Sequence, residues 1–98
     1  MSALLILNYD VIDPDELDSY RQVAASTILG ETGKLLVSTA HTYHLDEVTS
    51  GGSHTVVLQF DTVEEALDRY HGAAYQKVVG RRLNATVPRS AFVVSQPG

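Results

Sequence analysis

The chain contains no cysteine and no tryptophan. The absence of cysteine excludes disulfide bridges, thiolate catalysis, thiolate zinc sites and iron–sulfur clusters. Basic residues are also few, since seven Lys and Arg stand against twelve Asp and Glu, which gives a formal net charge of −5. Nucleic-acid backbones are bound by clustered cations, and the basic cluster of Lys77, Arg81 and Arg82 is too small for that task. We therefore expect no nucleic-acid partner.

Long hydrophobic runs are missing as well. The run from Ala3 to Leu7 is too short for a signal peptide and follows no basic residue. No stretch approaches the roughly 20 apolar residues of a membrane span, so we expect a cytoplasmic protein without a membrane partner. With 98 residues, 44% of them hydrophobic and 19% charged, the composition is that of one globular domain over residues 1–98.

The first part of the chain predicts a strand followed by a helix. Residues 3–10 (ALLILNYD) are apolar on both alternations over five residues, which is typical of a central strand. Asp13 and Pro14 suit the cap and the first position of a helix, with Glu16 at the spacing of a capping box. Gly30 is a suitable end for this helix.

The middle of the chain predicts a long β-hairpin. Residues 34–44 and 54–60 are rich in β-branched and aromatic side chains, which favour strands. Residues 50–53 (SGGS) between them have the composition of a turn.

The last part predicts helices and a final strand. Thr62 and Glu65 form a second capping box, and Gly72 should end or kink the helix that follows. Residues 75–83 have the pattern of a further short helix, and residues 90–95 that of the last strand.

The resulting order β-α-β-β-α-β predicts an α+β protein with a ferredoxin-like fold. Right-handed crossovers place both helical regions on one face of a four-stranded antiparallel sheet. The other face should be polar in a monomer, but strands one, three and four are apolar on both alternations. A large exposed apolar face is unusual on a monomer. We therefore predict a homodimer formed through the sheet face, with a cavity between or beside the two sheets.

The chain resembles the domain of unknown function 1330 family, which belongs to the dimeric α/β-barrel (ferredoxin-like) superfamily. The resemblance spans nearly the whole chain, and its most specific element is Tyr75-Gln76 with Arg82 seven residues after the tyrosine. It also rests on residues 10–14 (DVIDP), Tyr20, Gly33, residues 56–60 (VVLQF), residues 65–66 and Tyr70. The resemblance implies a ferredoxin-like fold that pairs into a dimeric α/β barrel. It implies no particular reaction, because the superfamily is functionally mixed.

The sequence departs from the family pattern at two places. Residues 38–40 (STA) stand where members often carry a basic residue followed by glycines, and His54 stands where an arginine is common. Haem-degrading and cofactor-free monooxygenases of the superfamily combine an Asn on the first strand with a Trp. This chain has Asn8 on that strand but no Trp.

The segment 70–83 carries most of the side chains capable of chemistry. Arg82 could hold a carboxylate or enolate oxygen in a forked contact, and Tyr75 could donate a proton to a substrate oxygen or accept one from it. Histidine is the usual side chain for acid–base chemistry near neutral pH, so His71 is a candidate base, with Tyr70 beside it in a substrate-binding role. The alternative is structural: the tyrosines are core rings with polar tips, and Arg82 pairs with a surface carboxylate.

The strands supply the other candidates. Asn8, Ser38 and His44 are expected to bind substrate, although Asn8 could instead be a satisfied polar group at a strand end. His54 is a second candidate base, and a pair formed by His44 and His54 is the best metal or acid–base alternative. No acidic third ligand has a convincing spacing, so we expect no metal site.

These features predict a small homodimer that acts on a small hydrophobic or aromatic metabolite without a metal or organic cofactor. If it is an enzyme, we expect proton-transfer chemistry of the isomerase, cyclase or lyase type. His71 or His54 would be the base, Tyr75 the acid or orienting donor, and Arg82 the anion anchor. A cofactor-free monooxygenase and a non-catalytic ligand-binding or assembly module are the alternatives.

Overall fold

The computed structural model describes residues 1–45 and 51–97. Along the chain its elements are β1 (Ala3–Val11), α1 (Pro14–Leu29), β2 (Lys34–Thr39), β3 (His54–Phe60), α2 (Val63–His71), α3 (Ala73–Gln76), α4 (Val79–Ala85) and β4 (Thr86–Ser95). The predicted β-α-β-β-α-β order is confirmed, with the second helical region divided into three helices. Among the described residues, no helix is long and apolar enough to cross a membrane.

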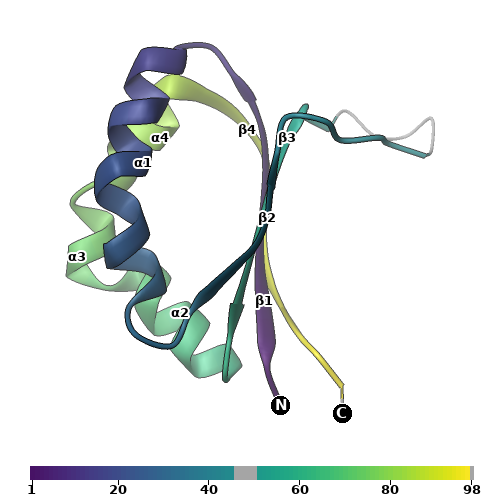
Figure 1. The fold of residues 1–98 in the computed structure, drawn as a ribbon, viewed down its shortest axis with the longest axis vertical. Helices are drawn as coiled ribbons and strands as arrows, with labels where there is room; N and C mark the ends of the chain where they lie inside the picture. Colours follow the sequence, from purple (N-terminus) through teal and green to yellow (C-terminus); the bar gives the residue numbers. More distant parts are fainter. Residues whose placement is uncertain (46–50, 98) are drawn as a thin grey trace.

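The four strands form one antiparallel sheet in the order β2-β3-β1-β4. The central strand β1 places Leu5 opposite Leu58 of β3 and opposite Val93 of β4. All the helices lie along one face of this sheet (Figure 1). The arrangement is the predicted ferredoxin-like class, and the sheet of the single chain is open rather than closed into a barrel.

The helix-covered face of the sheet forms the core. Leu5, Leu58 and Phe60 point into it, and Leu17 of α1 packs against them. Phe60 is only 1% exposed, and burying a ring of this size stabilises the fold by about 1.5–3 kcal/mol.

The other side of the sheet is called the open face here and is defined by Ile6, Val37, Val57, Phe92 and Val94. Ile6 pairs with Val57 and Phe92, and Val37 pairs with Val57. Val94 lies two residues after Phe92 along β4, so all five share one side of the sheet. Phe92 is 47% exposed and Val37 is 41% exposed. The apolar face that the sequence predicts is therefore present, and the helices lie on the opposite side (Figure 1).

The predicted helix ends are confirmed in atomic detail. The Asp13 carboxylate accepts a hydrogen bond from the amide of Glu16 at 3.1 Å, and the Thr62 hydroxyl accepts one from the amide of Glu65 at 3.0 Å. Each such cap stabilises its helix by about 1 kcal/mol. Gly30 ends α1 with a φ of 59°, a backbone conformation that disfavours other residues.

The second strand is shorter than predicted. β2 ends at Thr39, opposite Thr55, instead of continuing to His44. The Thr39 hydroxyl accepts a hydrogen bond from the amide of His41 at 3.0 Å, so beyond this point a side chain takes the place of the strand ladder. Of the predicted turn over residues 50–53, residue 50 lies outside the described residues.

Two other predicted boundaries also differ. Residues 75–83 do not form one helix, because α3 ends at Gln76 and α4 begins at Val79. The last strand begins at Thr86 and so includes Pro88, which the prediction left before it. Pro88 lies on an edge strand at a register irregularity, where the missing amide hydrogen removes no regular ladder bond.

Candidate functional site

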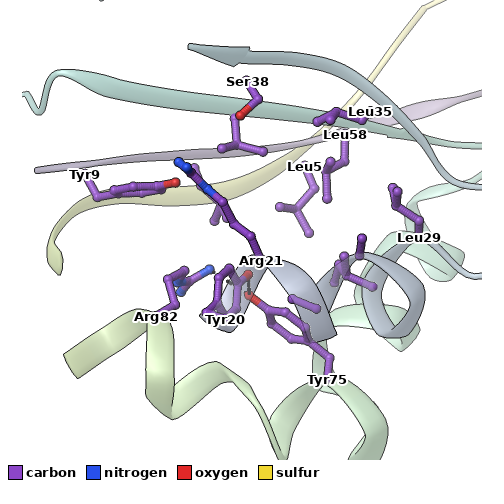
Figure 2. Close-up of a pocket in the computed structure, with 15 residues that line it drawn as sticks. Leu5, Tyr9, Tyr20, Arg21, Leu29, Leu35, Ser38, Leu58, Tyr75 and Arg82 are labelled. Atoms are coloured by element: carbon purple, nitrogen blue, oxygen red, sulfur yellow. Dashed lines mark hydrogen bonds between the residues drawn. The ribbon is translucent and has the colours of Figure 1, made fainter. Parts of the chain in front are cut away.

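A cavity of about 210 Å³ lies between the sheet and the helices. Leu5, Leu7 and Leu58 of the sheet and Ala24 and Ile28 of α1 make it largely apolar. Its polar lining consists of Tyr9, Tyr20, Arg21, Ser38, Tyr75 and Arg82. Figure 2 shows Tyr20, Tyr75 and Arg82 gathered on the helix side of this space, with Tyr9 and Ser38 on the sheet side.

Arg82 is the centre of a buried network of hydroxyl groups. Its side chain is 4% exposed, and its Nη1 donates to the Tyr75 hydroxyl at 3.0 Å. Its Nη2 donates to the Tyr70 hydroxyl at 3.2 Å, and its guanidinium carbon lies 5.8 Å from the centre of the Tyr70 ring. The Tyr75 and Tyr20 hydroxyls are 2.7 Å apart, so the network joins α4, α3, α2 and α1.

The charge of Arg82 has no carboxylate partner within residues 1–45 and 51–97. The ion pairs in this part of the chain are Arg21 with Asp18 at 3.8 Å and Arg89 with Asp10 at 2.9 Å. None of the described residues that line the cavity is Asp, Glu or His. The cavity is therefore electropositive, although the whole chain carries a net charge of −5.

The pKa shifts fix the protonation states of this network. Burial raises the pKa of Tyr75, and the neighbouring Tyr20 raises it further. Burial also raises the pKa of Tyr20. Burial alone would lower the pKa of Arg82, but its contacts with Tyr75 and Tyr70 outweigh this effect and the pKa is raised. At neutral pH the site therefore holds protonated hydroxyls and a charged guanidinium, all of which can donate hydrogen bonds.

Local contacts hold Arg82 in place. The Thr86 hydroxyl donates to the carbonyl of Arg82 at 2.7 Å and so anchors the end of α4. The Ala85 carbonyl accepts from the amides of Ile12 and Asp13 at 2.8 and 3.1 Å, which ties α4 to the end of β1. The guanidinium is thus carried by a short helix that is fixed at its C-terminal end.

Tyr75, Arg82 and Ser38 are the predicted site residues that line the cavity. Tyr70 is not among its lining residues, but it contacts Arg82 through its hydroxyl. A single helix over residues 75–83 would place Tyr75 and Arg82 two turns apart on one face, because their spacing is seven. They instead belong to α3 and α4, and the fold of the chain between these helices brings them together.

The two candidate bases lie away from the cavity. His71 is exposed, packs edge-on against Tyr70 at 5.3 Å between ring centres, and faces a separate hollow between α2 and β4. His54 stacks on Tyr9 at 5.7 Å between ring centres and contacts the Ser53 hydroxyl through Nδ1 at 3.0 Å. Neither imidazole is among the groups that line the cavity.

Asn8 and His44 lie on the open side of the sheet. The Asn8 amide nitrogen donates to the carbonyls of Gly52 and His54 at 3.0 and 2.9 Å and to the Thr55 hydroxyl at 3.0 Å. The His44 Nε2 lies 2.9 Å from the Gly52 carbonyl. These contacts support the structural alternative for Asn8, that of a satisfied polar group.

The predicted pair of His44 and His54 is not part of a metal-binding cluster in the part of the chain that the structure describes. That part holds no group of three or more His, Asp or Glu side chains placed to bind a metal ion. His44 and His54 each contact a different neighbour, namely Gly52 and Ser53.

Three polar lining residues were missing from the sequence prediction: Tyr9, Tyr20 and Arg21. Tyr9 alternates with Leu5 and Leu7 along β1, and this pattern could have placed it on the helix-covered face. Tyr20 recurs with Leu17, Ala24 and Ile28 at helical spacing along α1, and a tyrosine in such an apolar pattern suggests a core ring before it suggests a site. Arg21 has no sequence signal that distinguishes it from a surface arginine.

The comparisons with known proteins agree with this fold. The family described as "Domain of unknown function (DUF1330)" matches residues 2–96. The chain belongs to this family. The resemblance noted in the sequence is thereby confirmed, and the chain matches no curated protein.

Solved structures share the fold at low sequence identity. A dimeric protein of unknown function with a ferredoxin-like fold, from Bacteroides fragilis, aligns with a TM-score of 0.63 at 9% identity, covering 97% of this chain and 96% of that one. A protein of unknown function from Rhodopseudomonas palustris, in methylated form, gives 0.68 at 13% identity, with 99% and 81% covered. A candidate antibiotic biosynthesis monooxygenase from Chloroflexus aurantiacus gives 0.57 at 13% identity, with 100% and 95% covered. At these identities the likeness establishes the fold alone.

Proposed function

We propose that this protein binds a small, mainly apolar metabolite with one carboxylate or enolate group in the cavity between the helices and the sheet. The observation that supports this most strongly is the buried guanidinium of Arg82, whose partners among the described residues are tyrosine hydroxyls rather than carboxylates. Pockets for small molecules are typically apolar with a few convergent polar groups. The cavity of about 210 Å³ suits a ligand smaller than a drug-sized molecule.

The charge balance explains why the ligand should be anionic. Removing a cation from water costs several kcal/mol unless an opposite charge and hydrogen bonds compensate for it. Hydroxyl groups supply Arg82 with hydrogen bonds but not with negative charge. A carboxylate can take two parallel N–H donors from one guanidinium, which is the strongest pairing available to Arg. Such a ligand would also lie within reach of the hydroxyls that surround Arg82.

The polar groups of the site are hydrogen-bond donors. Tyr75 and Tyr20 keep their protons at neutral pH because burial raises their pKa values. They can therefore stabilise negative charge on a substrate oxygen by donating hydrogen bonds to it, with Tyr75 as the orienting donor, because a raised pKa makes a hydroxyl a weaker acid. This suits isomerase, cyclase or lyase reactions that pass through an enolate. Because His71 and His54 do not line the cavity, we assign neither as the base. The described lining residues supply hydrogen-bond donors, so the proton that is removed in forming an enolate would pass to a basic group of the substrate itself.

The proposed assembly is a homodimer through the open face. Phe92 is 47% exposed and Val94 is 39% exposed on this side of the sheet, and exposed apolar surface of this kind marks interaction sites. The Bacteroides fragilis protein with the same fold is dimeric. The cavity lies on the helix side of the sheet, so a dimer of this kind would leave its lining residues within each subunit.

A binding screen tests the function. Benzoate, phenylacetate and 3-methylbutanoate should bind the protein measurably, while the corresponding neutral amides should bind at least about tenfold more weakly, since they lack the charge that Arg82 attracts. Isothermal titration calorimetry gives both sets of dissociation constants. Equal affinity for acids and amides would contradict the proposed anion site.

A turnover assay separates the alternatives. Exchange of the α-hydrogens of a bound phenylacetate with deuterated water, followed by NMR, would support enolate chemistry. Oxygen uptake with a bound substrate would instead favour the cofactor-free monooxygenase. Binding without exchange or uptake would favour the non-catalytic ligand-binding module.

A further inference from the structure

A second hollow, of about 190 Å³, lies beside the cavity and is lined by α2 together with residues 91–93 of β4. Leu5 and Leu7 of β1 line both spaces. In the sheet order β2-β3-β1-β4, the cavity takes its other strand residues from the β3 side of β1, whereas the second hollow takes them from the β4 side. The two spaces are therefore neighbours that meet over β1.

The second hollow is suited to hydrocarbon rather than to charge. None of the described residues that line it is Asp, Glu, Lys or Arg. Two of its lining residues are partly accessible to solvent, since Leu67 is 41% exposed and Phe92 is 47% exposed. An anionic group would therefore remain with Arg82 in the cavity, and the second hollow could take only the apolar end of a ligand.

Tyr70 lies between the two spaces on the helix side. Its side chain lines the second hollow, and its hydroxyl accepts a hydrogen bond at 3.2 Å from Arg82, which lines the cavity. Its ring centre is 5.2 Å from that of Tyr75, which also lines the cavity. One side of the Tyr70 ring thus belongs to the second hollow, while the other side packs on the polar groups of the cavity.

We propose that Tyr70 separates the cavity from the second hollow and so limits the length of the acid that Arg82 binds. The proposal rests on the proposed function and narrows its ligand class to short-chain or single-ring monocarboxylates, whose apolar part fits the cavity alone. Removing the Tyr70 ring would join the two spaces over Leu5 and Leu7. The hydrocarbon end of a longer acid would then enter the second hollow, where burial of each further methylene group favours binding.

Isothermal titration calorimetry with the straight-chain acids from butanoate to decanoate tests the proposal. In the wild type the affinity should rise about fourfold with each added methylene group, reach a maximum within the series and then fall. Tyr70→Ala should move this maximum to acids longer by about two methylene groups, and it should bind the longest acids at least about tenfold more tightly than the wild type does.

Two control variants keep the separating ring. Tyr70→Phe removes only the hydroxyl that Arg82 contacts, so the length of the preferred acid should stay that of the wild type even if all affinities change. Leu67→Ala enlarges the second hollow without affecting a residue that lines the cavity, and it should also keep the wild-type preference. Tyr70→Val repeats the test with a larger side chain if circular dichroism shows that Tyr70→Ala is unfolded.

The results distinguish the role of Tyr70 from the proposed function. An unchanged length preference in the folded Tyr70→Ala or Tyr70→Val variant would overturn the role of Tyr70 and leave the anion site intact. The same holds for a wild type whose affinity still rises at decanoate, and for a Tyr70→Phe variant that shifts as far as Tyr70→Ala. A wild type that binds none of the acids would overturn the proposed function itself.

Discussion

Of the single-atom deletions possible in the site, removal of the Tyr75 hydroxyl oxygen should lower the free energy of unfolding most. It lies 3.0 Å from Arg82 Nη1 and 2.7 Å from the Tyr20 hydroxyl, and the side chain is 1% exposed, so water cannot readily replace the lost oxygen. A neutral hydrogen bond contributes about 1 kcal/mol and one to a charged group about 1.5–3 kcal/mol. Tyr75→Phe should therefore lower the free energy of unfolding by about 2.5–4 kcal/mol. Tyr20→Phe, which removes only the neutral bond, should cost about 1 kcal/mol.

Urea and thermal unfolding followed by circular dichroism measure this ranking. In a domain of this size 1 kcal/mol corresponds to a shift in Tm of about 4–8 °C, so Tyr75→Phe should lower Tm by at least about 10 °C. Tyr43→Phe is the control, because its hydroxyl is on an 86% exposed side chain and should matter by less than about 0.5 kcal/mol. If Tyr75→Phe costs no more than Tyr20→Phe, the buried network does not have the strength described.

Two further predictions concern pH. Burial raises the pKa values of Tyr20 and Tyr75 above their ordinary value of 10.0, so the folded chain keeps protons that the unfolded chain releases. The free energy of unfolding should then fall as pH rises past about 10, and phenolate absorbance should show these rings ionising only as the chain unfolds; their ionisation in the folded state would contradict this. The amide of Ser53, together with Arg89, holds the pKa of Asp10 below its ordinary value of 3.8. The stability lost in Asp10→Asn should accordingly be greatest well above pH 3.8 and vanish as pH falls through the lowered pKa, and a loss that persists in strong acid would refute this account.

Much of the fold follows from local signals in the sequence. Asp13 and Thr62 mark helix starts because their side chains satisfy free amides there, and Gly30 ends α1 in a conformation suited to glycine. The alternation along residues 3–10 predicts both the buried face and the apolar open face. The length of β2 was not predictable in the same way, because residues 40–44 keep strand-like composition while side-chain contacts replace the ladder.

The candidate site was predicted only in part. Arg82 and Tyr75 were identified by their chemistry and by the family resemblance, and both line the cavity. Tyr20 joins them across 55 residues of sequence, a contact that no local pattern reveals. His71 was grouped with them because it lies in the same short segment of the sequence. The chain turns at Gly72, where the backbone is extended with ψ of 152°, and the imidazole does not line the cavity.

The role of Asn8 shows a different limit of sequence reasoning. An amide on an apolar strand is consistent with either a ligand contact or a structural one. The choice depends on which groups lie beside Asn8 in the folded chain, and this is determined by contacts between residues 44 to 47 positions apart. In the folded chain the amide is occupied by Gly52, His54 and Thr55.

The affinity of the Arg82 site for a carboxylate is the measurement that tests the central claim most directly. The tightest-binding acid of the screen should be titrated into the wild type, Arg82→Gln and Arg81→Gln, with Tm recorded for each. Arg81 is the matched control, because it lies next to Arg82 on α4 but is exposed and does not line the cavity. We predict that Arg82→Gln, while still folded, weakens binding at least about tenfold and removes the preference for the acid over its amide, while Arg81→Gln leaves both unchanged. Equal affinities in the two variants would contradict the assignment of Arg82 as the anion anchor.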